Sequence, residues 1–86
     1  MVWTINFDLR AEKKFVKLEK QTQQRIRDFI DKKLTKNPRE YSKMLVGEDN
    51  LHRARVGDYR IIFVLKGKEL IIILIDLGHR SEIYKN

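Results

Sequence analysis

The pattern of hydrophobic and polar positions along the chain begins with a strand and two amphipathic helices. Residues 3–7 alternate between apolar and polar side chains, which is the period of a half-buried strand. Asp8, a residue type that caps helices, precedes a helical pattern over residues 9–19, and a second one covers residues 22–35. The apolar faces of these two helices are expected to carry Ala11, Phe15, Leu18, Ile26, Phe29, Ile30 and Leu34.

The second half of the chain has the pattern of strands. After a loop that begins around Pro38, three strands are predicted over residues 51–56, 59–65 and 69–76. Gly57-Asp58 between the first two predicts a tight hairpin with a type II′ turn, since glycine stands first. The run 70–75 is apolar on both alternations, so we expect an interior strand that is covered on both faces.

This order of elements predicts an α+β fold. Two N-terminal helices are expected to pack on one face of a largely antiparallel four-stranded sheet. The length of 86 residues fits one domain, so we interpret residues 1–86 as a single domain.

Composition restricts the class of protein and favours an anionic partner. The 42% of hydrophobic residues can form a core, and the absence of cysteine excludes disulfides and thiolate metal sites. Two histidines, His52 and His79, are too few for a zinc site, so no metal or other cofactor is expected. The longest apolar run has six residues, and the start of the chain lacks a signal-like stretch, so a cytoplasmic protein without a membrane partner is predicted. The net charge of +7 makes nucleic acid the first partner to consider.

The predicted hairpin places three arginines on one face of the sheet. With Gly57-Asp58 as the turn, Arg55 opposes Arg60 and Arg53 opposes Ile62. The other face then carries an apolar set that suits the helices, consisting of His52, Ala54, Val56, Tyr59, Ile61 and Phe63.

Two interpretations of these arginines remain open. They are either exposed side chains that lie flat over apolar neighbours, or an anion site, most plausibly for phosphate. A directly opposed like-charge pair costs up to about 1 kcal/mol. Three converging guanidiniums that carry such a cost favour the anion site.

The C-terminal segment adds groups that transfer protons. His79, Arg80 and Tyr84 follow the last predicted strand, and a bend at Gly78 is expected to turn part of this segment toward the arginines. RNA cleavage needs a base for the 2′-hydroxyl, cations for the charged phosphorane and an acid for the leaving 5′-oxygen. Together with the arginine face, the segment supplies these types of group.

The sequence resembles the RelE family of toxins, which is part of the RelE/ParE superfamily of type II toxin–antitoxin systems. The resemblance spans nearly the whole chain, from the paired helices through the stretch 43–47. It is carried by the hairpin Arg53-Ala54-Arg55-Val56-Gly57-Asp58-Tyr59-Arg60-Ile61-Ile62-Phe63 and by Gly78-His79-Arg80-Ser81-Glu82-Ile83-Tyr84. The family implies a small microbial-RNase-like sandwich.

The resemblance also implies a function. Members are endoribonucleases that need no metal, cleave messenger RNA in the ribosomal A site through attack by the 2′-hydroxyl, and so inhibit translation. A cognate antitoxin protein neutralises them. By this resemblance, RNA binding falls to Arg53, Arg55 and Lys43, and the catalytic set comprises Arg60, His79, Arg80 and Tyr84.

The sequence departs from the family pattern at the expected base. Some members carry lysines on the strand that here holds Arg53 and Arg55, and one of these lysines is a base candidate. An arginine stays protonated at neutral pH and is therefore a poor base. We therefore expect His79 or Tyr84 to take part in proton transfer and the arginines to act electrostatically.

Three alternatives remain. A ParE-type toxin shares the fold but inhibits DNA gyrase, and a non-catalytic nucleic-acid-binding module would use the same basic face without turnover. The third is an inactive toxin homologue, against which the arginines at 53, 55, 60 and 80 argue.

Overall fold

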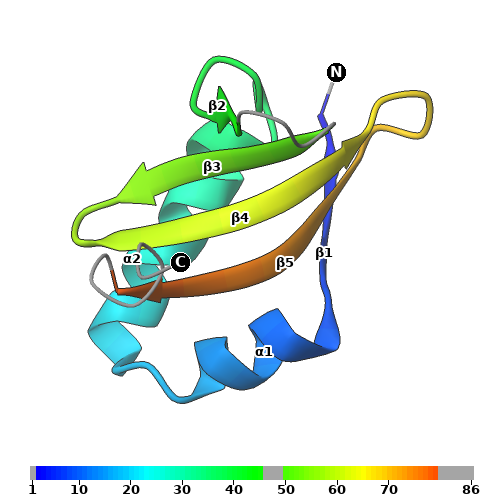
Figure 1. Ribbon diagram of the computed structural model, residues 1–86. Helices are drawn as coiled ribbons and strands as arrows, with labels where there is room; N and C mark the ends of the chain where they lie inside the picture. Colours follow the sequence, from blue (N-terminus) through cyan, green and yellow to red (C-terminus); the bar gives the residue numbers. More distant parts are fainter. Residues whose placement is uncertain (1, 46–49, 80–86) are drawn as a thin grey trace.

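The protein folds into a five-stranded sheet with its helices on one face (Figure 1). The computed structural model describes residues 2–45 and 50–79. The elements in chain order are β1 (Thr4–Phe7), α1 (Leu9–Val16), α2 (Lys20–Phe29), the π-helical turn η1 (Ile30–Leu34), β2 (Lys43–Met44), β3 (Leu51–Val56), β4 (Tyr59–Lys66) and β5 (Ile71–His79). The α+β fold class is confirmed, with one strand more than the four expected.

The sheet has the order β1-β5-β4-β3-β2. β1 pairs with β5 in parallel, and the other neighbours are antiparallel. The additional strand, β2, spans only Lys43–Met44. Two residues are too few for an alternating pattern, which is why the sequence did not predict it.

α1 begins at Leu9 as predicted, whereas α2 begins at Lys20, two residues before the expected start. Asp8 caps α1, since its Oδ1 accepts a hydrogen bond of 2.6 Å from the backbone N–H of Arg10. α1 packs mainly on β5, and α2, which continues into η1, packs on β3. The helix residues that are buried against the sheet are Ala11, Phe15, Ile26, Ile30 and Leu34. Among the described residues, no helix is long and apolar enough to span a membrane.

The hairpin between β3 and β4 has the register that its turn predicts. Arg55 pairs with Arg60, Arg53 with Ile62, and Val56 with Tyr59. Gly57 has a φ of +61°, and Asp58 does not share the positive φ, which fits the type II′ turn. Because register determines which side each residue faces, the arginines lie on the face away from the helices.

The core lies between the helices and the sheet. Ala54, Ile61, Phe63, Leu74 and Leu77 are all buried on this side. The face of the sheet away from the helices, which we call the open face, is less covered. There the isoleucines of β5 are only half-buried, at positions 71, 73 and 75. β5 is thus an interior strand, but the expectation that both of its faces are fully covered is wrong, because the helices occupy one face only.

Candidate anion-binding site on the open face

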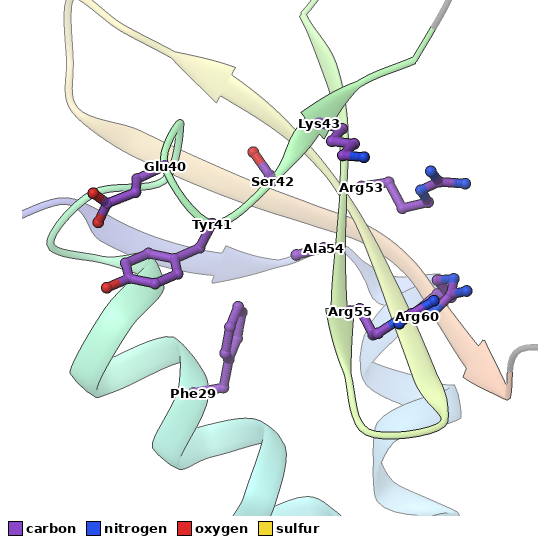
Figure 2. Close-up of a pocket in the computed structure, with 9 residues that line it drawn as sticks. All are labelled: Phe29, Glu40, Tyr41, Ser42, Lys43, Arg53, Ala54, Arg55 and Arg60. Atoms are coloured by element: carbon purple, nitrogen blue, oxygen red, sulfur yellow. The ribbon is translucent and has the colours of Figure 1, made fainter.

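Four cations from three neighbouring strands lie together on the open face. The pairing of β2 with β3 sets Lys43 opposite Arg53, and the pairing of β3 with β4 sets Arg55 opposite Arg60. Figure 2 shows all four side chains extending to the same side of the sheet. The sequence predicted this grouping for the three arginines, and β2 adds Lys43 to it. We call these four residues the basic cluster.

Burial differs within the basic cluster. Lys43 and Arg55 are exposed and Arg53 is half-buried, whereas only 3% of Arg60 is exposed. Arg60 lies on β4, the middle strand of the sheet, opposite Gly78 of β5. A guanidinium held in this way needs little reorganisation to meet a developing negative charge.

The basic cluster lines one side of a groove of about 430 Å³ at the edge of β3. Phe29, Glu40, Tyr41 and Ser42 also line this groove, but they lie on the other side of β3, and the side chains of the basic cluster extend away from them (Figure 2). Phe29 and Tyr41 were not among the predicted site residues. Phe29 belonged to the apolar face of a helix, and Tyr41 lies in a loop without periodicity, so neither pattern pointed to a site.

Glu40 makes ionisation of the Tyr41 phenol still less favourable. The negative charge of the Glu40 carboxylate, its hydrogen bond with the phenol and desolvation together raise the pKa of Tyr41 above its usual value. The phenol is therefore neutral at physiological pH. It offers an aromatic ring and a hydroxyl group to the groove, but no base.

A buried histidine supports the segment that leads to Lys43. His52 stacks on Phe63, with ring centroids 5.6 Å apart, and its Nδ1 lies 3.5 Å from Ser42 Oγ. The Ser42 hydroxyl donates a 2.6 Å hydrogen bond to the Pro38 carbonyl. Burial, and secondly the charge of Arg39, lower the pKa of His52, so the neutral form is favoured.

His79 lies on the other side of the sheet from the basic cluster. β5 continues in register through Gly78, and His79 pairs with Tyr59, whose ring it contacts edge-on at 5.5 Å. It lines a separate hollow of about 240 Å³ with Lys14, Lys17, Leu18 and Leu77. The expected bend at Gly78 therefore does not bring His79 to the arginines, because strand alternation directs it toward the helices.

Two members of the predicted catalytic set, Arg80 and Tyr84, lie outside the described residues. Their roles remain predictions.

Asp76 is the carboxylate of β5 that lies nearest in register to the basic cluster. It forms an ion pair with Lys14 Nζ at 2.7 Å and accepts a hydrogen bond of 2.9 Å from the backbone N–H of Leu77. Within residues 2–45 and 50–79, no group of three or more metal-ligating side chains comes together.

Comparisons with known proteins define the family to which this chain belongs. Residues 5–84 match the family model of the ParE toxin of the type II toxin–antitoxin system parDE. The protein is thus a toxin of the type II toxin–antitoxin class. The chain belongs to the ParE toxin family, within the RelE/ParE superfamily.

Solved structures of RelE toxins share the fold. A chain of the RelBE2 toxin–antitoxin complex from Mycobacterium tuberculosis superposes with a TM-score of 0.87 at 22% identity, covering 93% of this chain and 100% of that one. A chain of the archaeal RelE–RelB complex from Pyrococcus horikoshii OT3 gives a TM-score of 0.75 at 26% identity, with coverage of 94% and 98%. A chain of the RelB–RelE complex from Methanococcus jannaschii gives 0.72 at 27% identity, with coverage of 91% and 93%. A search of curated protein sequences finds no match.

Proposed function

We propose that this toxin is a metal-independent endoribonuclease that cleaves messenger RNA in the ribosomal A site and thereby inhibits translation in the cytoplasm. The observation that carries the proposal is the basic cluster, in which a buried Arg60 lies beside more exposed cations. A cognate antitoxin protein would keep the toxin inactive, by analogy with the RelB–RelE antitoxin–toxin complexes to which the chain is similar.

The cluster supplies the electrostatic part of the reaction. A base removes the proton of the ribose 2′-hydroxyl, and the 2′-oxygen attacks the adjacent phosphorus. The bond to the 5′-oxygen then breaks as an acid protonates that oxygen, which leaves a 2′,3′-cyclic phosphate. In this scheme Arg60 holds the phosphorane oxygens, while Arg53, Arg55 and Lys43 bind the flanking phosphates.

The position of His79 changes the assignment of proton transfer. Its imidazole contacts Tyr59 on the helix side of the sheet, so it cannot reach a phosphate bound at Arg60 without breaking the end of β5. Within the predicted catalytic set, this favours Tyr84 over His79 for proton transfer. Arg80 is proposed to stabilise the transition state together with Arg60.

Programmed ribosomes provide the test. The purified toxin should cut the message at the A-site codon, and naked message should stay intact. We expect Arg60→Ala to lower the cleavage rate about 100-fold or more, which is typical for the loss of one preorganised donor. His79→Ala should cut nearly as fast as the wild type. A control variant, Lys68→Ala, removes an exposed cation in the turn before β5 and should have no effect. Unchanged cleavage by Arg60→Ala would contradict the mechanism.

Inhibition of DNA gyrase is the second candidate, because the matching family model describes ParE toxins. A supercoiling assay with purified gyrase, run beside the ribosome assay, separates the two activities. Gyrase inhibition without message cleavage would replace the proposal with the ParE-type function. Salt-sensitive RNA binding without any product would instead indicate a non-catalytic binding module.

A further inference from the structure

A continuous groove follows the outer edge of β3. The hollow at the basic cluster adjoins a second one of about 370 Å³, between β3 and α2, and the two share Phe29 and Arg55. The second hollow is also lined by Arg25, Asp28, Lys32, Lys33, Val56 and Gly57. The groove therefore leads from the basic cluster past an aromatic side chain to the cationic face of α2 and η1.

The charge of this groove suits a polyanion. The helical wall contributes three exposed cations, Arg25, Lys32 and Lys33, to those that the strands supply. Two acids, Asp28 and Glu40, accompany them. Along β3, Arg53 and Arg55 are two residues apart, about 6.6 Å, which is comparable to the separation of adjacent phosphates in an extended single strand.

Two aromatic rings form a corner inside the groove. Phe29 and Tyr41 meet at 82°, with ring centroids 6.2 Å apart, and 38% of Tyr41 is exposed. Lys33 Nζ lies 5.8 Å from the centre of the Tyr41 ring. A flat heterocycle in this corner can stack on one ring while it meets the edge of the other. Stacking on aromatic side chains beside a cationic track is how single-stranded nucleic acids are bound.

The edge of β3 argues against an added peptide strand as the occupant. In a two-residue hairpin, Val56 and Tyr59 exchange hydrogen bonds, so the backbone groups of Arg55 and Arg53 point outward. β2 already pairs opposite Arg53. Only Arg55 then offers outward backbone groups between β2 and the turn, whereas strand addition depends on several such hydrogen bonds.

We propose that the corner of Phe29 and Tyr41 binds one nucleobase of the single-stranded message next to the phosphate held by the basic cluster. This inference rests on the proposed function, which supplies the RNA strand. It adds a base-binding subsite between β3 and α2. The cations of α2 and η1, with Lys33 nearest to Tyr41, then bind the phosphates that follow this base.

Photochemical cross-linking tests the subsite. Ribosomes are programmed with messages that carry a single 5-iodouridine at successive positions around the A-site codon, and 2′-O-methyl groups on the codon block cleavage. Iodouracil couples to the aromatic ring on which it stacks. We expect one message position to cross-link to Tyr41 or Phe29, as read by peptide mass spectrometry, and Tyr41→Ala to abolish the cross-link at residue 41.

Kinetics on cleavable message provide a second measurement. Tyr41→Ala should raise the ribosome concentration for half-maximal cleavage about tenfold, with an unchanged rate at saturation. Tyr41→Phe retains the ring and should match the wild type. Lys33→Glu should weaken binding more than Lys68→Glu, which makes the same charge change at an exposed position outside the groove.

The outcomes separate the subsite from the proposed function. If unmodified message is cleaved but the cross-links fall elsewhere or are absent, the subsite is wrong and the function stands. If neither cleavage nor a cross-link occurs, both are wrong. A cross-link at the corner without cleavage of unmodified message supports the subsite in a binding protein. Docking of gyrase or of an acidic peptide at the same groove, with no RNA cross-link, would overturn it.

Discussion

At the scale of single residues, the opposed pair of Arg55 and Arg60 links stability to binding. The two guanidiniums lie on the same face at directly paired positions, and Arg60 is buried while Arg55 is exposed. Like charges in this arrangement cost up to about 1 kcal/mol. The pair therefore lowers the stability of the free protein, and under the proposed function a bound phosphate would offset this loss.

Replacing the exposed member of this pair should stabilise the free protein. We expect Arg55→Thr to raise the free energy of unfolding by about 0.5 kcal/mol, since it removes the repulsion and threonine suits a strand. The same variant should bind message more weakly. Urea denaturation measures the first effect, and ribosome-dependent cleavage at limiting concentration measures the second. A loss of stability in Arg55→Thr would show that the pair is not repulsive in the free protein.

His52 should make the stability of the fold depend on pH. Burial and Arg39 lower its pKa in the folded protein, whereas the unfolded chain takes up the proton near its ordinary value of about 6.5. As pH falls below that value the unfolded state binds more protons, so the stability that is present above it is progressively lost. We expect the urea concentration at half-unfolding to fall as the pH is lowered from about 7.5 to about 5.5. The fall should be smaller in His52→Gln. Parallel pH profiles for both proteins would rule out this role for His52.

At the scale of elements, the β3–β4 turn fixes the position of the arginines. Gly57 has a φ of +61°, and a Cβ atom there would lie 3.2 Å from a guanidinium nitrogen of Arg25. Gly57→Ala should therefore destabilise the protein by about 1–2 kcal/mol, mainly through the left-handed backbone conformation. Gly67→Ala is the matched control, because its φ is ordinary and its nearest neighbour would be 3.7 Å away. Chemical denaturation of both variants measures the difference, and equal stabilities would contradict the argument.

The elements that could be predicted from sequence are those that local rules determine. The two-residue turn at Gly57-Asp58 dictates the whole β3–β4 register, and through it the face on which Arg53, Arg55 and Arg60 lie. The capping of α1 by Asp8 is equally local. Both features follow from residues that are close together in the sequence, so the rest of the chain was not needed to predict them.

Other features depend on contacts between distant segments. β2 forms because Lys43 and Met44 pair with the edge of β3. The apolar run in β5 does not indicate that helices cover only one face of the sheet. His79 was expected near the arginines because a glycine precedes it. Instead β4 holds that segment in register and directs its side chain to Tyr59. The approach of Tyr41 to Phe29 likewise depends on how a loop packs against α2.

At the scale of the whole molecule, most of the charge excess lies away from the basic cluster. Residues 1–43, of which only Lys43 belongs to the basic cluster, hold 12 of the 19 lysines and arginines against 6 of the 12 acids. On α1, Lys14 is bonded to Asp76, whereas Lys13 and Lys17 are exposed. Exposed charges of this kind act through their long-range field, which speeds encounters with a polyanion and is screened by salt.

This separation predicts that the helices affect association and the cluster affects turnover. Under the proposed function, a double variant Lys13→Glu and Lys17→Glu should slow association with ribosomes several-fold at low salt, because it reverses part of the attracting field. The difference from the wild type should shrink as ionic strength rises toward about 0.5 M, where the Debye length falls below about 5 Å. The cleavage rate at saturating ribosome concentration should stay unchanged, in contrast to that of Arg60→Ala. Stopped-flow association at several salt concentrations, combined with single-turnover cleavage, measures both quantities. If the helix variant lowered the saturated rate as much as Arg60→Ala does, the helices would belong to the reaction site, and the assignment of turnover to the basic cluster alone would be wrong.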